Sequence, residues 1–200
     1  MSAKKNPEIK ISERERQLLL IGTPTKSQKE DFTEEIRKYD SEYRLFEVLN
    51  KKIRKQGHLT NEDLFEICMW KSPRQKKRYQ ENNPDEVIKT TEKAFKENTD
   101  LGKLISLLDL NGIGIPTASA ILAVYDPENF GVIDIRALQV LNSAGLIDSD
   151  NANSEKIWSE YIKKLRLLKG KYACTARAVD KALYTMHLQY TKNRNLYKKK

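Results

Sequence analysis

The sequence has little cysteine and no long apolar run. It contains only two cysteines, Cys68 and Cys174, and they form no Cys-x-x-Cys motif. This spacing argues against a disulfide framework and against a zinc site. No stretch approaches the roughly 20 apolar residues that a membrane-spanning helix needs. The first ten residues, MSAKKNPEIK, have no apolar signal core, so a cytoplasmic protein is expected.

The sequence also lacks an internal repeat and any convincing run of β-strands. Apolar residues instead recur at helical spacing through most of the chain, which predicts an all-α fold. Two hundred residues are enough for one substantial domain and short for two. We expect a loose polar arm over residues 1–33, a helical domain over 34–190 and a basic tail over 191–200. Within the arm, the apolar residues 18–21 favour one short docked helix; a disordered leader is the alternative.

Several short motifs predict helix boundaries. A helix that begins near residue 33 should end at Gly57, and Thr60 with Asp63 resembles a capping box for the next helix. Asn83-Pro84 combines a cap with a proline at the first helical position. Further starts are predicted at Asp100, Asp134 and Ser154, and further ends at Gly145 and Gly170.

Positive charge is abundant: the formal net charge is +9 and the pI is about 9.4. Such a balance suggests an anionic partner, and nucleic acid fits better than a membrane. The segment 70–79 (WKSPRQKKRY) is strongly basic and has an aromatic residue at each end. Basic side chains neutralise phosphates, while aromatics and arginine stack on bases or wedge into a duplex. The predicted DNA contacts here are Trp70, Lys71, Ser72, Arg74, Lys76 and Lys77. The alternative is a solvated helix start with Trp70 in the core.

The stretch from residue 110 to residue 141 is the most informative. It opens with Gly112-Ile113-Gly114, between apolar segments that we expect to be helices over 101–108 and 115–125. A Gly-x-Gly turn that leads into a helix leaves N–H groups free at the positive end of the helix dipole, where a phosphate can bind. Asp134 stands at the head of the next helical pattern. One short helix thus joins an anion-binding turn to a carboxylate.

This stretch resembles the helix-hairpin-helix DNA glycosylase superfamily. LNGIGIPTASAIL is similar to the hairpin of that superfamily, and VIDIRALQVL is similar to the segment with its catalytic aspartate. Asp134 follows Pro116, which occupies the lysine position of the hairpin, by 18 residues, as in the endonuclease III branch. The resemblance implies a helical glycosylase-like domain, DNA as partner and Asp134 as the catalytic residue. It also implies hairpin contacts to DNA from Gly112, Ile113, Gly114 and Thr117.

The departures from the family pattern restrict the chemistry. Bifunctional members form a Schiff base with the sugar through a lysine, and Pro116 has no amine. The iron–sulfur cluster of some members needs four cysteines, which this chain lacks. The resemblance therefore implies a monofunctional enzyme, which hydrolyses the N-glycosidic bond of a damaged or mismatched base. We expect no cofactor and a monomer.

Asp134 has two interpretations at this point. A carboxylate below the sugar would stabilise the positive charge that develops as the glycosidic bond breaks. Arg136, which replaces the family's histidine, would pair with Asp134 and favour its ionised form, or would contact a phosphate. Aspartate is also a favoured N-cap residue, and capping alone would explain it. The alternative function is a DNA-binding protein that keeps the scaffold without the chemistry.

Overall fold

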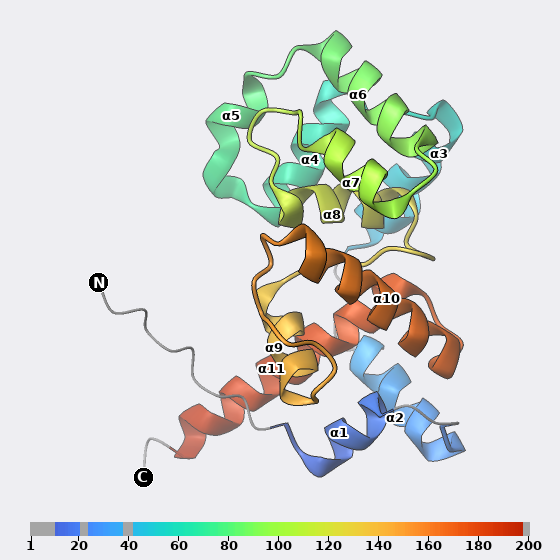
Figure 1. Ribbon diagram of the computed structural model, residues 1–200, viewed down its shortest axis with the longest axis vertical. Helices are drawn as coiled ribbons and strands as arrows, with labels where there is room; N and C mark the ends of the chain where they lie inside the picture. Colours follow the sequence, from blue (N-terminus) through green and yellow to red (C-terminus); the bar gives the residue numbers. More distant parts are fainter. Residues whose placement is uncertain (1–10, 21–23, 38–41, 198–200) are drawn as a thin grey trace.

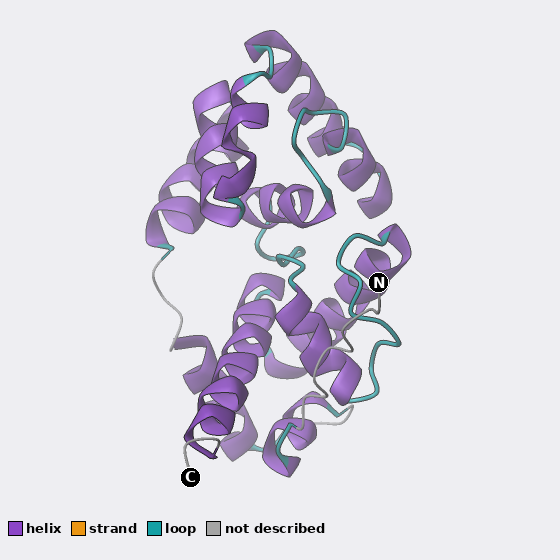
Figure 2. Ribbon diagram, turned by 90° about the vertical axis from the view of Figure 1, so that its left-hand side faces the viewer, coloured by secondary structure: helices purple, strands orange, loops and turns teal. Residues whose placement is uncertain are grey.

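Helices and connecting loops make up the described part of the chain. The computed structural model describes residues 11–20, 24–37 and 42–197, and these residues contain no strand (Figure 1 and Figure 2). The all-α prediction is confirmed. The helices are α1 (Glu13–Leu19), α2 (Lys26–Arg37), a π-helix (Arg44–Leu49), α3 (Asn50–Gln56), α4 (Asn61–Lys71), a 3₁₀ turn (Pro73–Gln75), α5 (Lys76–Gln80), α6 (Pro84–Lys96), α7 (Asp100–Leu107), α8 (Ile115–Tyr125), α9 (Ile135–Ser143), α10 (Glu155–Tyr172) and α11 (Ala176–Tyr197). Within these residues, no helix is both long enough and apolar enough to cross a membrane.

The helices form two groups along the long axis of the molecule (Figure 1). The upper lobe (residues 50–125) contains α3 to α8, in which α6 packs on α7 and α4 packs on α8. The lower lobe (residues 11–20, 24–37 and 135–197) is built around α11, which contacts α2, α9 and α10. One polar link between the lobes is the Arg166–Asp100 pair, whose two N–O distances are 2.5 and 3.0 Å.

An extended segment, residues 131–134, joins the lobes between α8 and α9. Its backbone polar groups are buried, and side chains from α4, α8, α10 and α11 satisfy them. The Ile133 N–H donates to Ser119 Oγ of α8 at 3.0 Å, and the Val132 N–H donates to Asp180 Oδ2 of α11 at 2.6 Å. The Tyr161 hydroxyl of α10 donates to the Val132 carbonyl at 3.1 Å. These bonds set the position at which α9 begins.

The described part of the N-terminal arm, residues 11–20 and 24–33, is packed rather than loose. It contains α1 and α2, and Leu18, Leu19 and Phe32 are buried. The Phe32 ring stacks on the Tyr172 ring of α10 with a centroid distance of 4.0 Å. The predicted boundary at residue 33 was therefore wrong, because it falls inside α2. The predicted tail was also misplaced, since α11 continues to Tyr197; residues 1–10 and 198–200 lie outside the described residues.

The single helix predicted to begin near residue 33 was also wrong. Helix α2 ends at Arg37, residues 38–41 lie outside the described part, and the π-helix precedes α3. A π-helix has a different phase from an α-helix, so one apolar face cannot continue through it. Tyr43, expected on that face, is 70% exposed. The helix end at Gly57 is confirmed, with a left-handed φ of +77°.

Most of the other predicted helix boundaries are confirmed. Thr60 and Asp63 form a reciprocal capping box, and the side chains of Asn83 and Ser154 cap α6 and α10. Two predictions were wrong. Thr99 rather than Asp100 caps α7, which leaves Asp100 to pair with Arg166. Helix α10 continues past Gly170 to Tyr172, because its apolar face extends through the buried Leu168 and Tyr172.

Substituting Gly131 by alanine should destabilise the junction between the lobes. A Cβ atom there would lie 2.4 Å from Leu165 Cδ1 and 2.7 Å from Asp180 Oδ2. Overpacking of this kind costs about 1–3 kcal/mol. The control is Gly170→Ala in α10, where a Cβ would meet no atom within 4 Å and should stabilise by about 0.5–1 kcal/mol. Urea unfolding of both variants measures the difference, and equal stability would contradict the tight packing at Gly131.

Candidate functional site

The hairpin turn between α7 and α8 is clamped against the end of α5. Gly112 has a left-handed φ of +83°, and a Cβ there would lie 2.9 Å from Arg78 Cβ. The side chain of Asn82 pairs with the backbone of Asn111: the Asn111 N–H donates to Oδ1 at 2.7 Å, and Nδ2 donates to the Asn111 carbonyl at 3.0 Å. The two predicted flanking helices are thus confirmed, and the turn between them is held by side-chain contacts.

The N-terminus of helix α8 lies at the hairpin. Its N-cap is Gly114, which has no side chain to satisfy the first N–H groups, and Pro116 follows in the first turn. The side chains of Ile113 and Thr117 are buried. Their backbone N–H groups donate to the carbonyls of Leu110 at 3.1 Å and Gly114 at 2.9 Å, so neither residue offers a free N–H group to a ligand.

The basic segment 70–79 divides into inward and outward side chains. Arg74, Lys76 and Lys77 are exposed. Trp70 is half-buried and packs edge-on against Phe46, with a centroid distance of 5.8 Å. Lys71 points inward, with only 14% of its side chain exposed.

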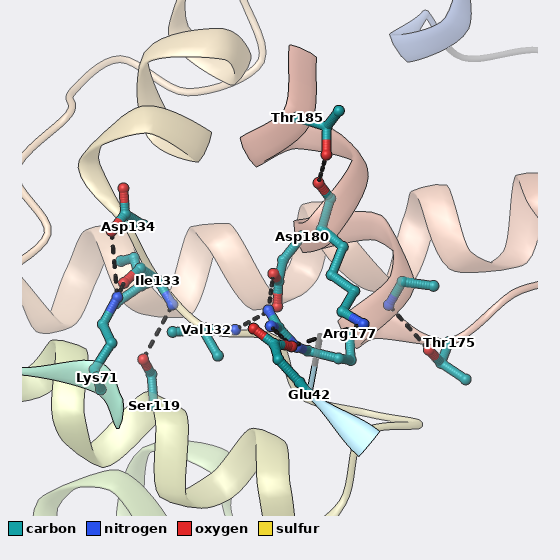
Figure 3. Close-up of polar contacts among 12 residues, drawn as sticks. Glu42, Lys71, Ser119, Val132, Ile133, Asp134, Thr175, Arg177, Asp180 and Thr185 are labelled. Atoms are coloured by element: carbon teal, nitrogen blue, oxygen red, sulfur yellow. Dashed lines mark hydrogen bonds and ion pairs between the residues drawn. The ribbon is translucent and has the colours of Figure 1, made fainter. Parts of the chain in front are cut away.

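Asp134 is the N-cap of α9 and is also surrounded by cations. Its Oδ1 accepts the Arg136 backbone N–H at 3.0 Å, and the Arg136 guanidinium lies 3.5 Å from the same oxygen. Lys71 Nζ lies 3.3 Å from Oδ2 and 3.3 Å from the Ile133 carbonyl oxygen (Figure 3). The structure therefore combines the capping role with an ion-paired carboxylate that is 23% exposed.

Two cavities meet at Lys71 and Asp134, which line both. The larger, a cleft of about 680 Å³, lies between the hairpin, the basic segment and the loop before α10; its lining includes Lys71, Ser72, Arg74, Gly112, Gly114, Pro116, Thr117, Asp134 and Asp150. The smaller, of about 190 Å³, is lined by Trp70, Lys71, Val132, Asp134, Arg136, Ala137, Arg177, Asp180 and Tyr184. The prediction that Asp134 faces a cleft at a helix start is confirmed. Of the predicted site residues, Ile113, Lys76 and Lys77 line neither cavity.

A buried charge cluster forms the back of the smaller cavity. Arg177 contacts Glu42 Oε2 at 2.5 Å and also pairs with Asp180 Oδ1 (Figure 3). Its guanidinium lies 5.5 Å from the Trp70 ring centroid. Burial raises the pKa of Asp180 to about 6, against the lowering effect of Arg177. No sequence pattern pointed to this cluster; the spacing of Arg177 and Asp180 suits a helical ion pair, but nothing in it indicates burial.

The two cysteines contribute no metal site. Both are free thiols, and burial raises the pKa of Cys68 to about 12 and that of Cys174 to about 11. Among the residues that the structure describes, no group of three or more histidine, cysteine, aspartate or glutamate side chains could hold a metal ion.

No protein-family profile, curated protein or solved structure matches this chain.

Replacing Arg177 by methionine should destabilise the protein strongly. The change leaves the carboxylates of Glu42 and Asp180 buried beside an apolar group, and breaking a buried ion pair from one side costs about 3–5 kcal/mol. The matched control is Arg44→Met, which breaks the pair of Arg44 with Glu66 at the surface, where the Arg44 side chain is 77% exposed. That pair should contribute at most about 1 kcal/mol. Chemical denaturation of the two variants compares them, and similar losses would contradict a structural role for the buried cluster.

Proposed function

We propose that the protein is a DNA glycosylase of the helix-hairpin-helix type, which hydrolyses the N-glycosidic bond of a damaged or mismatched base. One observation carries the proposal: the Asp134 carboxylate stands where a cleft bordered by the hairpin meets a smaller cavity. A glycosylase needs a phosphate-binding surface, a pocket for one base and a carboxylate between them. The site has a candidate for each.

The cleft is the proposed phosphate-binding surface. The N-terminus of α8 at Gly114, which is the positive end of the helix dipole, and the guanidinium of Arg74 line it, and both favour an anion. Lys76 and Lys77 lie exposed on the adjoining α5 and extend the positive surface beyond the cleft. The overall charge of +9 would attract DNA to this face before specific contacts form.

The smaller cavity is the proposed pocket for the base. At about 190 Å³ it is below the roughly 300–1,000 Å³ typical of sites for drug-sized ligands, so it suits one small flat group. Trp70 and Tyr184 supply aromatic surface, and the Arg136 guanidinium lies 5.3 Å from the Tyr184 ring centroid. Arg177 lines the cavity too, and its buried Nε has no hydrogen-bond partner within the described residues.

The chemistry assigned to Asp134 is electrostatic. Breaking the glycosidic bond leaves positive charge on C1′ and the ring oxygen of the sugar, and a carboxylate beside it stabilises that charge. Lys71 Nζ and the Arg136 guanidinium lie 3.3 and 3.5 Å from the Asp134 oxygens. Water that enters from the cleft then adds to C1′. The base must first leave the stack, which costs a few kcal/mol and least for a damaged or mispaired base.

A second candidate function is DNA binding without chemistry. It is favoured by the contacts of Asp134, whose two oxygens are occupied by the α9 backbone, Lys71 and Arg136. A residue so engaged would serve as a helix cap and as an anchor for the basic residues. The two functions differ in what happens when the charge of Asp134 is removed.

Substituting Asp134 by asparagine should abolish base release and leave DNA binding intact or tighter. Asparagine is also a favoured N-cap, so the start of α9 should survive the change. Asp150→Asn is the control, because Asp150 lines the same cleft but not the smaller cavity. The assay incubates duplexes that carry a panel of damaged or mismatched bases and detects the free base by chromatography.

Two results would count against catalysis by Asp134. Parallel loss of thermal stability and DNA affinity in Asp134→Asn would assign the residue to capping alone. A wild-type protein that binds the duplexes and releases no base from any of them would support the non-catalytic function.

DNA affinity should fall steeply with salt, and the exposed basic residues should account for part of the slope. Replacing Arg74, Lys76 and Lys77 together by alanine should reduce the slope of log affinity against log salt by about 0.9 for each phosphate that the variant no longer neutralises. The control triple variant changes one arginine and two lysines that are exposed elsewhere, Arg54, Lys55 and Lys89. Fluorescence anisotropy at several salt concentrations measures both slopes. Equal slopes would show that the basic segment is solvated surface.

A further inference from the structure

We infer that the smaller cavity selects bases that leave the sugar as anions and rejects bases that carry a positive charge. The inference rests on the proposed function, because it names the class of base that the proposed pocket accepts. The selecting groups are the cations that line the cavity, Lys71, Arg136 and Arg177.

Positive charge exceeds negative charge around this cavity. Three cations and two carboxylates line it: Lys71, Arg136, Arg177, Asp134 and Asp180. Beyond the lining, Glu42 and Lys181 add one charge of each sign, with Lys181 Nζ 3.7 Å from Glu42 Oε2. The side chains of Lys71 and Arg177 are only 14% and 8% exposed, so salt and water screen their charges less than those of surface residues. The surroundings therefore favour a negative charge in the cavity over a positive one.

Both carboxylates are already paired with groups of the protein (Figure 3). Asp180 accepts a backbone N–H with Oδ2 and pairs with Arg177 through Oδ1. Asp134 accepts the Arg136 N–H with Oδ1, and its Oδ2 lies 3.3 Å from Lys71 Nζ. A cationic base would have to displace one of these groups before it could pair with a carboxylate.

The aromatic rings of the cavity also have cations beside them. The Arg177 guanidinium lies 5.5 Å from the Trp70 ring centroid, and the Arg136 guanidinium lies 5.3 Å from the Tyr184 ring centroid. Both distances are within the range of a cation–π contact. A cationic base stacked on either ring would bring a second positive charge to it, whereas a neutral base would not.

The charge of the base during cleavage decides which bases gain from this environment. When the glycosidic bond breaks, its electron pair stays on the base nitrogen. A base that is neutral in DNA therefore leaves as an anion, and a base that is cationic in DNA leaves neutral. Fixed positive charge stabilises the departing anion. Water adds to C1′, and the proton that it loses ends on the base nitrogen, so the products are the free base and an abasic sugar.

Arg136 is the cation best suited to a test. It lines the smaller cavity and not the cleft, and its side chain is 43% exposed, outside the buried charge cluster. Arg136→Gln removes the charge and keeps a polar side chain. If Arg136 only positions Asp134, the variant should slow the release of every base by the same factor. A selecting charge instead changes the ratio of the rates for different bases.

The test measures single-turnover base release from duplexes that carry two pairs of bases of similar size. In the pyrimidine pair, 3-methyluracil is neutral and 3-methylcytosine is cationic; in the purine pair, 8-oxoguanine is neutral and 7-methylguanine is cationic. Each rate is divided by the spontaneous rate of the same duplex, because cationic bases are released faster without any protein. In the wild type, this rate enhancement should be larger for the neutral member of a pair.

Arg136→Gln should lower the enhancement for neutral bases about tenfold, which is less than the roughly hundredfold or greater loss of an oxyanion-hole donor, since Arg136 is partly exposed. The enhancement for cationic bases should stay unchanged or rise. Arg136→Lys keeps the charge and should restore the preference. Arg74→Gln is the matched control, because Arg74 lines the cleft and not the smaller cavity, and it should change the rates on all four duplexes by one common factor.

The outcomes distinguish this inference from the proposed function. Preferential enhancement for a cationic base, in either pair or in the wider panel of lesions, overturns the inference and leaves the glycosylase function standing. Equal slowing of both members of a pair by Arg136→Gln also overturns it, and Arg136 would then only position Asp134. A wild-type protein that releases no base from any duplex overturns the inference together with the proposed function. The wild-type comparison decides by itself if Arg136→Gln melts well below the wild type.

Discussion

The hydrogen bonds of the extended segment 131–134 are the constraint on which the site depends. Only a few residues separate the two lobes, and their peptide groups are buried where water cannot satisfy them. Ser119, Tyr161 and Asp180 supply the partners from α8, α10 and α11. Burial raises the pKa of the Tyr161 phenol well above its ordinary value, so the hydroxyl remains a donor. Because each partner comes from a different helix, the segment has one position, and so has the start of α9 with Asp134.

The same segment connects Asp134 to the buried charge cluster of Arg177, Asp180 and Glu42. Asp180 uses one oxygen for the Val132 N–H and the other for Arg177, which in turn contacts Glu42. Buried ion pairs of this kind add little net stability, since desolvation offsets much of the attraction. Their value here is positional: Glu42, just before the π-helix, and Arg177, on α11, are tied to the backbone that presents Asp134. The smaller cavity is left between these fixed groups.

The sequence predicted those parts of the fold that local chemistry determines. The capping box at Thr60, the cap at Asn83 and the helices on both sides of Gly112 depend on neighbouring residues and were predicted correctly. The hairpin motif and the spacing to Asp134 also placed both at one cleft. The apolar periodicity predicted one continuous α-helix where the structure has a π-helix, because the spacing of residues in a π-helix depends on tertiary packing.

Tertiary contacts decided what the sequence could not show. The sequence of the N-terminal arm is mostly polar, yet a few of its apolar residues, such as Phe32, are buried in the core. Lys71 stands in a run of surface-like basic residues, and only the fold shows that it turns toward Asp134. Arg177 and Glu42 lie 135 positions apart in the chain, so no local pattern pairs them.

The clamp between Asn82 and the hairpin has a consequence for the cost of binding. The paired hydrogen bonds to Asn111 and the close approach of Gly112 to α5 join the hairpin to the basic segment. Two surfaces far apart in sequence are therefore at a set spacing before any ligand arrives. A long anion that spans both would lose its own freedom on binding but would find little left to order in the protein. More of the contact energy then appears as affinity, and an anion with a different spacing between its charges gains less.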